Sequence, residues 1–255
     1  MPQLLQRISG RLRRLTQGHI RHRRLYLPFI VNKQGLEIGG PSEVFRRRQP
    51  IDLYQCVGGL NNCDFSRSTV WAEQKDDFTF DPQKAPGKSI FCDGSELVSV
   101  PDRTYDFILS SHNLEHFANP VKALKEWKRV LRPSGALVLV LPYYKRTFDH
   151  RREPTSVEHM LEDFERNTGE DDLTHLPEII EKHDLSMDPG AGSAEEFHKR
   201  SQNNFSNRCL HHHVFDTSLA REMVEQAGFS VLSAARPTRM DIVVLARKPS
   251  RGQPG

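Results

Sequence analysis

The segment 119–141 constrains the fold of this chain more than any other. An Asn119-Pro120 pair typical of a helix start precedes apolar residues at helical spacing over 121–131. The Pro-Ser-Gly sequence at 133–135 ends that helix, and residues 136–141 are all apolar. An unbroken apolar run of this length predicts a strand covered on both faces, as in a parallel sheet. The segment therefore predicts an α/β fold.

The same alternation of strands and helices recurs along the chain and predicts a doubly wound, mostly parallel sheet. Strands or extended segments are expected at 35–38, 51–57, 89–92, 105–110, 229–234 and 241–247, and helices at 121–131, 155–167, 176–183 and 217–227, the last capped by Asp216. Residues 143–210 are polar and break this rhythm, so we expect an inserted helical lid there. The expected organisation is a basic segment 1–30, a main domain 31–248 and a flexible tail 249–255.

Charge is distributed unevenly along the chain. The net charge is +3, yet residues 1–48 carry eleven Lys and Arg against two Glu, which is +9 and leaves −6 for the other 207 residues. Leucine and isoleucine recur among the arginines of 3–24 at roughly helical spacing, which predicts a basic amphipathic helix. Two interpretations stay open: residues 1–24 contact an anionic membrane or phosphorylated partner, or they form a solvated helix packed by one face on the body.

Several protein classes are disfavoured by the composition. The longest apolar run, 136–141, is far shorter than the roughly 20 residues that span a bilayer, and no secretory signal is recognisable. The four cysteines are irregularly spaced without a C-x-x-C pair, which argues against a disulfide framework and a zinc ribbon. We expect a cytoplasmic protein, with peripheral contact to the inner membrane surface as the hypothesis attached to residues 1–24.

Four motifs, taken in order, resemble those of class I S-adenosylmethionine-dependent methyltransferases: Leu36–Pro41, Phe91–Gly94, 105–110 followed by His112–His116, and Trp127–Ala136. Within that class the chain is similar to the type-11-like group, whose members often accompany glycan and polysaccharide biosynthesis enzymes. The resemblance covers roughly 35–248. It implies a Rossmann-like, seven-stranded sheet with an antiparallel last strand, and S-adenosylmethionine as cofactor. The first turn departs from the family's E-x-G-x-G-x-G pattern, because Pro41 and Ser42 replace the last glycines.

The resemblance also suggests a cofactor site. Gly39 and Gly40 would let the backbone approach the methionine part, with Glu37 holding the turn or the cofactor ammonium through water. The pair Asp93-Gly94 would lie beside the adenine. Further pocket residues would follow the strand 105–110, namely Ser110, Ser111, His112 and Leu114.

An acidic residue about 20 positions after the glycine turn suits the ribose, because a carboxylate can accept from both hydroxyls. Asp64, which is 25 residues after Gly39, is the preferred candidate. Asp52 lies closer in sequence and stays open as the alternative.

Histidines are the predicted catalytic residues, since a hydroxyl acceptor must lose a proton during methyl transfer. The candidates are His116, His211 and His213, the last two on one face of an extended segment. Three adjacent histidines with His150, His159 and Asp149 nearby also raise the possibility of a metal. Neighbouring ligands on a strand diverge, however, and no H-x-x-x-H or H-x-x-E-H pattern connects these particular histidines, so no metal is expected.

The polar insertion supplies the predicted acceptor site. Its proposed ligands are Arg146, His150, Arg151, Asn204 and Arg208, since arginine suits carboxylate or phosphate and asparagine suits sugar hydroxyls. A charged solvent-facing surface is the alternative. The favoured function is O-methylation of a sugar, glycan or other polar small molecule. Two alternatives stay open. One is a nucleic-acid methyltransferase, which we do not expect because the chain lacks an N-P-P-Y-type motif. The other is a non-catalytic binding module on the same fold.

Overall fold

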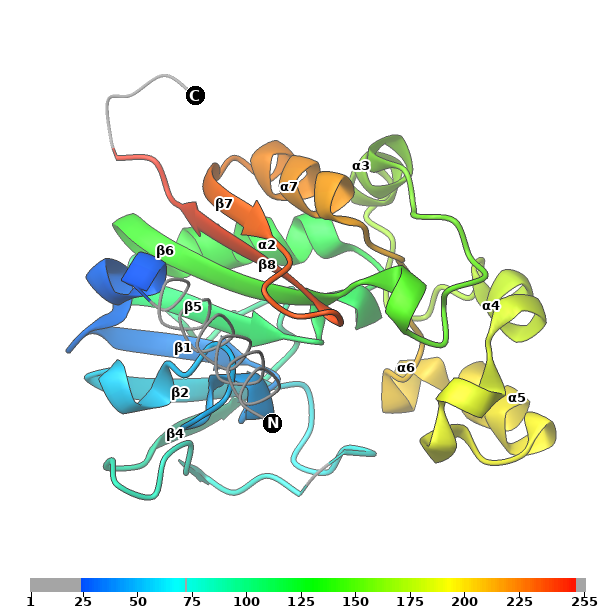
Figure 1. The fold of residues 1–255 in the computed structure, drawn as a ribbon, viewed down its shortest axis with the longest axis horizontal. Helices are drawn as coiled ribbons and strands as arrows, with labels where there is room; N and C mark the ends of the chain where they lie inside the picture. Colours follow the sequence, from blue (N-terminus) through cyan, green and yellow to red (C-terminus); the bar gives the residue numbers. More distant parts are fainter. Residues whose placement is uncertain (1–23, 72, 251–255) are drawn as a thin grey trace, which may run out of the picture.

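A twisted eight-stranded sheet forms the centre of the protein. The computed structural model describes residues 24–71 and 73–250. The strands are β1 (Gln34–Ile38), β2 (Gly59–Asp64), β3 (Asp77–Phe78), β4 (Gly87–Phe91), β5 (Tyr105–Ser111), β6 (Leu131–Pro142), β7 (Ser230–Ala235) and β8 (Asp241–Arg247). Their order across the sheet is β3-β4-β2-β1-β5-β6-β8-β7 (Figure 1).

The strand directions confirm the predicted fold class. Strands β4, β2, β1, β5 and β6 are mutually parallel, whereas β8 pairs antiparallel with both β6 and β7. Two strands were not predicted: β2, and β3, which is a two-residue antiparallel edge on β4. Because the five parallel strands run the same way, their carboxyl ends meet at one edge of the sheet, where open α/β sheets bind ligands.

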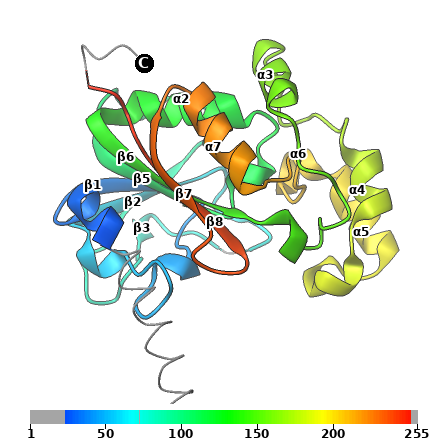
Figure 2. The ribbon, with the colours of Figure 1, turned by 45° about the horizontal axis from the view of Figure 1, so that its top comes forward.

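The two faces of the sheet are covered differently, as Figure 2 shows. Helices α2 (Pro120–Val130) and α7 (Thr217–Gln226) cover one face, and α3 (Val157–Glu165) packs against both of them. The other face is covered by helical residues 24–30 and by two 3-10 turns, η1 (Glu43–Phe45) and η2 (Tyr54–Cys56). The strand predicted at 51–57 is therefore wrong. Its apolar side chains are buried because they cover the sheet, without joining it.

Capping signals placed the main helices correctly. The Asn119 side chain accepts a hydrogen bond from Lys122 N, and Asp216 accepts one from Leu219 N, so both caps satisfy helix-end donors. The helix predicted at 121–131 is α2, and the one at 217–227 is α7. Strand β6 follows α2 directly and begins earlier than its apolar run suggested.

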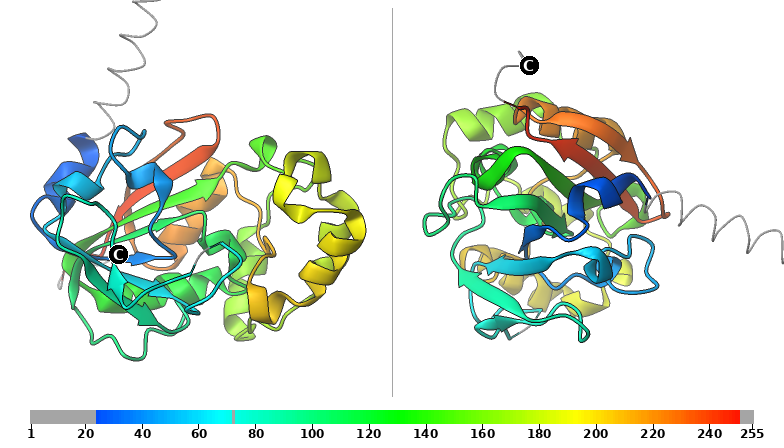
Figure 3. Two further views of the ribbon diagram at one scale, coloured as in Figure 1. Left: turned by 90° about the horizontal axis from the view of Figure 1, so that it is seen from below. Right: turned by 90° about the vertical axis from the view of Figure 1, so that its left-hand side faces the viewer.

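The insertion forms a lobe beside the carboxyl edge of the sheet (Figure 3). It contains α3, α4 (Leu176–Lys182), α5 (Ala194–Gln202) and α6 (Asn204–Asn207). Away from α3, its own small core consists of Ile179, Ala191, Phe197 and Leu210. The sequence predicted α3 and α4 but not α5. No helix within residues 24–71 and 73–250 is long and apolar enough to cross a membrane.

Candidate active site

A cavity of about 670 Å³ opens at the carboxyl ends of β1, β2, β4 and β5, and we call it the donor cavity. Its volume is ordinary for a site that holds a cofactor. Seven residues predicted for cofactor binding line it: Gly39, Gly40, Asp64, Asp93, Gly94, Ser111 and His112. The other three, Glu37, Ser110 and Leu114, are fully buried and lie behind its wall.

Glu37 stabilises the glycine turn after β1 through hydrogen bonds. Its carboxylate accepts hydrogen bonds from Ser42 N (3.1 Å), Ser42 Oγ (2.7 Å) and the Tyr54 hydroxyl (2.8 Å). Burial raises the pKa of Glu37 to about 7, although these hydrogen bonds oppose the shift. Gly39 has φ of +77°, a conformation that strongly favours glycine. Ser42, which departs from the family pattern, thus completes the turn instead of disrupting it.

Asn62 also supports this turn and was not predicted. Its side chain is fully buried; Oδ1 accepts from Gly40 N (2.9 Å) and Nδ2 donates to Gly40 O (3.3 Å). Both backbone groups of Gly40 are thereby satisfied. Asn62 lies in a polar strand that was not predicted, so no local pattern in the sequence identified it.

Asp64 ends β2 and lies on the cavity wall, where Gln74 Nε2 donates to its carboxylate (3.3 Å). Burial raises its pKa to about 6. Asp52 lies outside the wall and accepts hydrogen bonds from Gln55 and from Arg48 N. Of the two candidates for the acid that binds the ribose, only Asp64 lines the cavity.

Arg208, predicted to bind the acceptor, instead reaches the donor cavity from the insertion. Its guanidinium forms ion pairs with Asp93 (3.2 Å) and Glu170 (2.7 Å). Asp93 keeps its other oxygen for Ser95, which donates through both its backbone and its hydroxyl. Burial raises the pKa of Glu170 to about 7 despite the opposing charge of Arg208. The insertion thus helps to enclose the donor cavity.

A second cavity, of about 940 Å³, adjoins the first, and we call it the acceptor cavity. Four residues line both cavities: Trp71, His112, His116 and Met240. The remaining wall comes mainly from the insertion and includes predicted residues Arg146 and His211. Two ligands could therefore meet at the shared wall.

His211 and Asp149 form a close pair on this second wall. The His211 Nδ1 to Asp149 Oδ2 distance is 2.6 Å, and both side chains are at least 89% buried. Burial alone would raise the pKa of Asp149, but the charges of His211 and Arg152 hold it below its usual value. Arg152, itself buried, also donates to the carbonyls of His211 and His212. When His211 is neutral, the carboxylate accepts a hydrogen bond from Nδ1–H, and Nε2 is left as the proton acceptor.

His116 packs edge-on against His211, with ring centroids 4.6 Å apart, and its Nδ1 lies 3.0 Å from Leu210 O. Burial and neighbouring His211 lower its pKa well below the usual value, so it is neutral at pH 7. Glu115, next to it, is fully buried, and neither carboxylate oxygen has a hydrogen-bond partner among the described residues. Burial raises the Glu115 pKa.

At the shared wall, His112 Nε2 lies 2.9 Å from Asp241 Oδ1 at the start of β8. Burial would lower the pKa of His112, but Asp241 and the charge of Glu115 raise it. His112 follows the end of β5 and lines both cavities, and Asp241 lines the donor cavity.

Residues 60–139 match the protein family described as Methyltransferase domain. That stretch covers β2 to β6, which supply much of the donor cavity. The protein is a methyltransferase whose family match covers 80 of its 255 residues. Its methyl donor is S-adenosylmethionine, and the cavity fits it: it opens at the carboxyl ends of the parallel strands, and the acid Asp64 ends β2.

A solved methyltransferase shares this fold. The S-adenosylmethionine-dependent methyltransferase of Mesorhizobium loti is 14% identical, with 90% of this chain and 97% of that chain covered and a TM-score of 0.52. Putative methyltransferases of Listeria monocytogenes (15% identity; 92% and 100% covered; TM-score 0.49) and Bacillus halodurans (13%; 90% and 98%; 0.49) also align. No curated protein matches the sequence.

The remaining predicted residues of the methyltransferase lie away from both cavities. His213 is 1% exposed and points to α3, so it does not share a site with His211 as its alternation suggested. Asn204 is buried and bonds His212, whereas His150 and Arg151 face Asp184 on the lobe surface. Sequence reasoning missed Trp71, Asn62 and Glu170 in the site.

Proposed function

We propose that this methyltransferase transfers the methyl group of S-adenosylmethionine to an oxygen of a sugar, glycan or similar polar small molecule, and that it acts beside enzymes of glycan biosynthesis. The observation that supports this proposal is the His211–Asp149 pair on the wall of the acceptor cavity. A buried imidazole with its Nδ1 held by a carboxylate is suited to take a proton from a hydroxyl group.

The chemistry needs little beyond positioning and proton removal. Bound in the donor cavity, S-adenosylmethionine supplies an electrophilic methyl group on a sulfonium. The acceptor hydroxyl must lie in line with it and lose its proton to His211 Nε2, while Asp149 stabilises the imidazolium that forms. His116, between the cavities, stays neutral and packs against His211. We therefore assign His211 as the base and His116 as a neutral contact to the acceptor.

The character of the acceptor follows from the wall of its cavity. Arg146, Arg200 and Asp188 offer charged hydrogen-bond groups, and Trp71 and Phe148 offer flat aromatic surfaces. Sugars combine hydroxyl groups with apolar ring faces, so both kinds of contact suit them. Arginine would also accommodate a carboxylate or phosphate on the same molecule.

The test is a labelled-methyl assay with a panel of soluble and lipid-linked glycans, followed by mass identification of the product. An O-methylated glycan, with turnover lost in His211→Gln and kept in His198→Ala, supports the proposal. His198 is exposed on α5 and serves as the matched control. Transfer to nitrogen or to nucleic acid only would contradict the acceptor class. Absence of binding of S-adenosylhomocysteine at millimolar concentration in calorimetry would contradict the enzyme assignment.

We also propose that residues 1–24 bring the enzyme to an anionic membrane surface. This segment lies almost wholly outside the described residues, so the support is the sequence alone: seven arginines without an acidic residue. At low salt, the full chain should sediment with vesicles that contain phosphatidylglycerol. A protein that lacks residues 1–24 should stay in the supernatant. Equal retention of both proteins would refute this role.

A further inference from the structure

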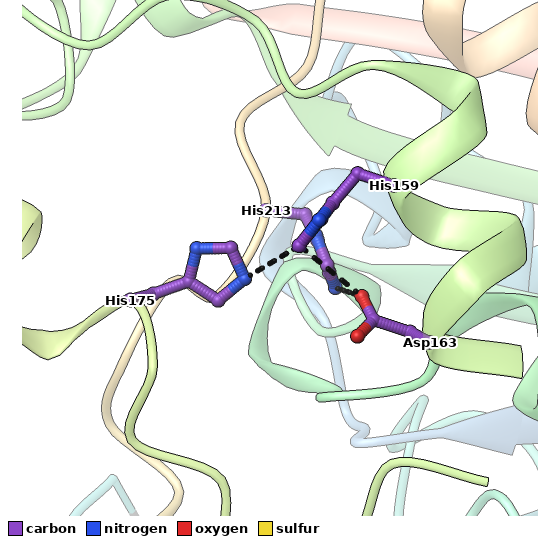
Figure 4. A group of neighbouring side chains, drawn as sticks. All are labelled: His159, Asp163, His175 and His213. Atoms are coloured by element: carbon purple, nitrogen blue, oxygen red, sulfur yellow. Dashed lines mark hydrogen bonds and ion pairs between the residues drawn. The ribbon is translucent and has the colours of Figure 1, made fainter. Parts of the chain in front are cut away.

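Four side chains outside both cavities converge at the base of the insertion. They are His159 and Asp163 on α3, His175 just before α4, and His213 on the segment that leads to α7 (Figure 4). One potential ligand atom from each lies within 4.8 Å of all the others. His159 and Asp163 are four residues apart, so they share one face of the helix.

The distances within this group are those of a small coordination shell. His159 Nε2 lies 3.0 Å from His175 Nε2 and 3.4 Å from Asp163 Oδ2, and His213 Nε2 lies 3.7 Å from the same oxygen. Zinc bonds to nitrogen and oxygen of about 2.0–2.1 Å in a tetrahedron require ligand atoms roughly 3.3 Å apart. The three measured distances scatter around that value.

Hydrogen bonding alone leaves this group unsatisfied. Asp163 Oδ2 is buried and has no hydrogen-bond partner among the described residues, although two imidazole nitrogens face it. The other oxygen, Oδ1, accepts from Thr168 Oγ1 (3.0 Å), which fixes the orientation of the carboxylate. A buried carboxylate oxygen that has only these long ion-pair contacts and no hydrogen bond is costly, and a cation would satisfy it. The Thr168 contact is the kind of supporting interaction that orients metal ligands.

A bound metal ion would also stabilise the insertion by cross-linking it. The insertion's own core contains only four buried apolar side chains, and small lobes of this kind commonly rely on a metal or disulfide. The four ligands come from three separate stretches of chain, so one ion would join α3, the loop before α4 and the segment 211–213. His213 would exchange its present contact with Ala118 O (3.2 Å) for the metal.

We propose that His159, Asp163, His175 and His213 form a structural Zn²⁺ site. The site is closed by four protein ligands, as structural zinc sites are, and it takes no part in methyl transfer. This differs from the sequence-based expectation of no metal. The H-x-x-x-D spacing at 159–163 places two of the ligands on one helix face, whereas the contribution of His213 depends on the fold.

The test uses the full chain without a histidine tag. Elemental analysis after expression with zinc should find about one Zn²⁺ per chain, and Asp163→Ala and His175→Ala should each lose that ion. His198→Ala, an exposed histidine on the same lobe, should keep it. Substitution with Co²⁺ should produce the visible absorption of tetrahedral coordination.

Two further measurements distinguish loss of a metal ligand from misfolding and from metal binding elsewhere. His175→Cys should retain Co²⁺ and add a thiolate-to-cobalt charge-transfer band, which a misfolded variant would not do. His116→Ala controls for the other grouping of possible ligands, Glu115, His116 and His211. Loss of the ion in His116→Ala with retention in His175→Ala would overturn the proposal. Absence of both bound zinc and a Co²⁺ spectrum in the unmodified protein would overturn it as well.

Discussion

Replacing Asp64 by asparagine tests the donor cavity with the smallest change in shape. Asp64 ends β2 on the cavity wall, and Asn keeps its size but removes the negative charge. Hydrogen bonds to charged groups contribute about 1.5–3 kcal/mol, and Asn can still accept one with its carbonyl oxygen. Loss of one charged hydrogen bond to the ribose should therefore raise the Kd of S-adenosylhomocysteine roughly 10- to 150-fold. Isothermal titration calorimetry at pH 8 measures the change directly.

The matched control is Asp52→Asn, because Asp52 lies nearby in sequence but outside the cavity wall. It should leave the Kd within about twofold, since it alters only contacts to Gln55 and Arg48. If Asp52→Asn weakened binding while Asp64→Asn did not, the assignment of the ribose acid would be wrong.

A second prediction compares the pH dependence of S-adenosylhomocysteine binding by the unmodified protein and by Asp64→Asn. Burial raises the pKa of Asp64 to about 6, so the carboxylate is ionised at pH 8 and largely protonated at pH 5. The part of the binding energy that depends on its charge is present above that pKa and is lost below it. Binding by the unmodified protein should weaken below pH 6 more than binding by Asp64→Asn. Parallel pH profiles would contradict this mechanism.

Three further predictions concern other residues. Asp149→Asn should lower the single-turnover rate of methyl transfer about 10²- to 10⁴-fold while leaving the Kd of S-adenosylhomocysteine unchanged, and an unchanged rate would exclude the base assignment. Asn62→Ala leaves Gly40 N–H buried without its acceptor and should reduce the free energy of unfolding by about 1–3 kcal/mol in urea titrations; a neutral effect would show that the turn is held otherwise. For Glu37, burial raises the folded pKa from 4.5 to about 7, so its contribution to stability is present below pH 4.5 and lost as the pH rises through 7. Glu37→Gln should flatten the pH dependence of the unfolding free energy over that range by about 3 kcal/mol, and identical slopes would refute the raised pKa.

Much of the sheet could be predicted from the sequence because strands such as β5 and β6 are short apolar runs, and because capped helices precede β6 and β7. Strand β2 contains two asparagines and was not predicted. Local signals were sufficient at Asn119 and Asp216, whose side chains do cap α2 and α7. The error at 51–57 has the same origin: apolar residues that cover a sheet face have the same pattern as residues within a strand. The missed helix α5 begins with a capping box, Ser193 and Glu196, that could have been recognised.

The donor cavity was predicted better than the acceptor cavity for a physical reason. Residues such as Asp64 and Asp93 directly end or follow strands, so their positions are consequences of the sheet. The insertion contains no strand of the sheet that would fix the positions of its residues. Its site residues come together through contacts between stretches that are far apart in the sequence. Arg208 reaches Asp93 across 115 positions and Asp149 reaches His211 across 62, and no local pattern encodes either contact.

Residues 211–213 have three different partners on consecutive side chains: Asp149 for His211, Asn204 for His212 and the α3 carboxylate for His213. Inserting or deleting one residue here would reassign all three partners at once. We therefore expect homologous chains to vary in length across the lobe but to keep a constant spacing from His211 to the cap of α7. That spacing can be used to align distant sequences where identity alone does not suffice.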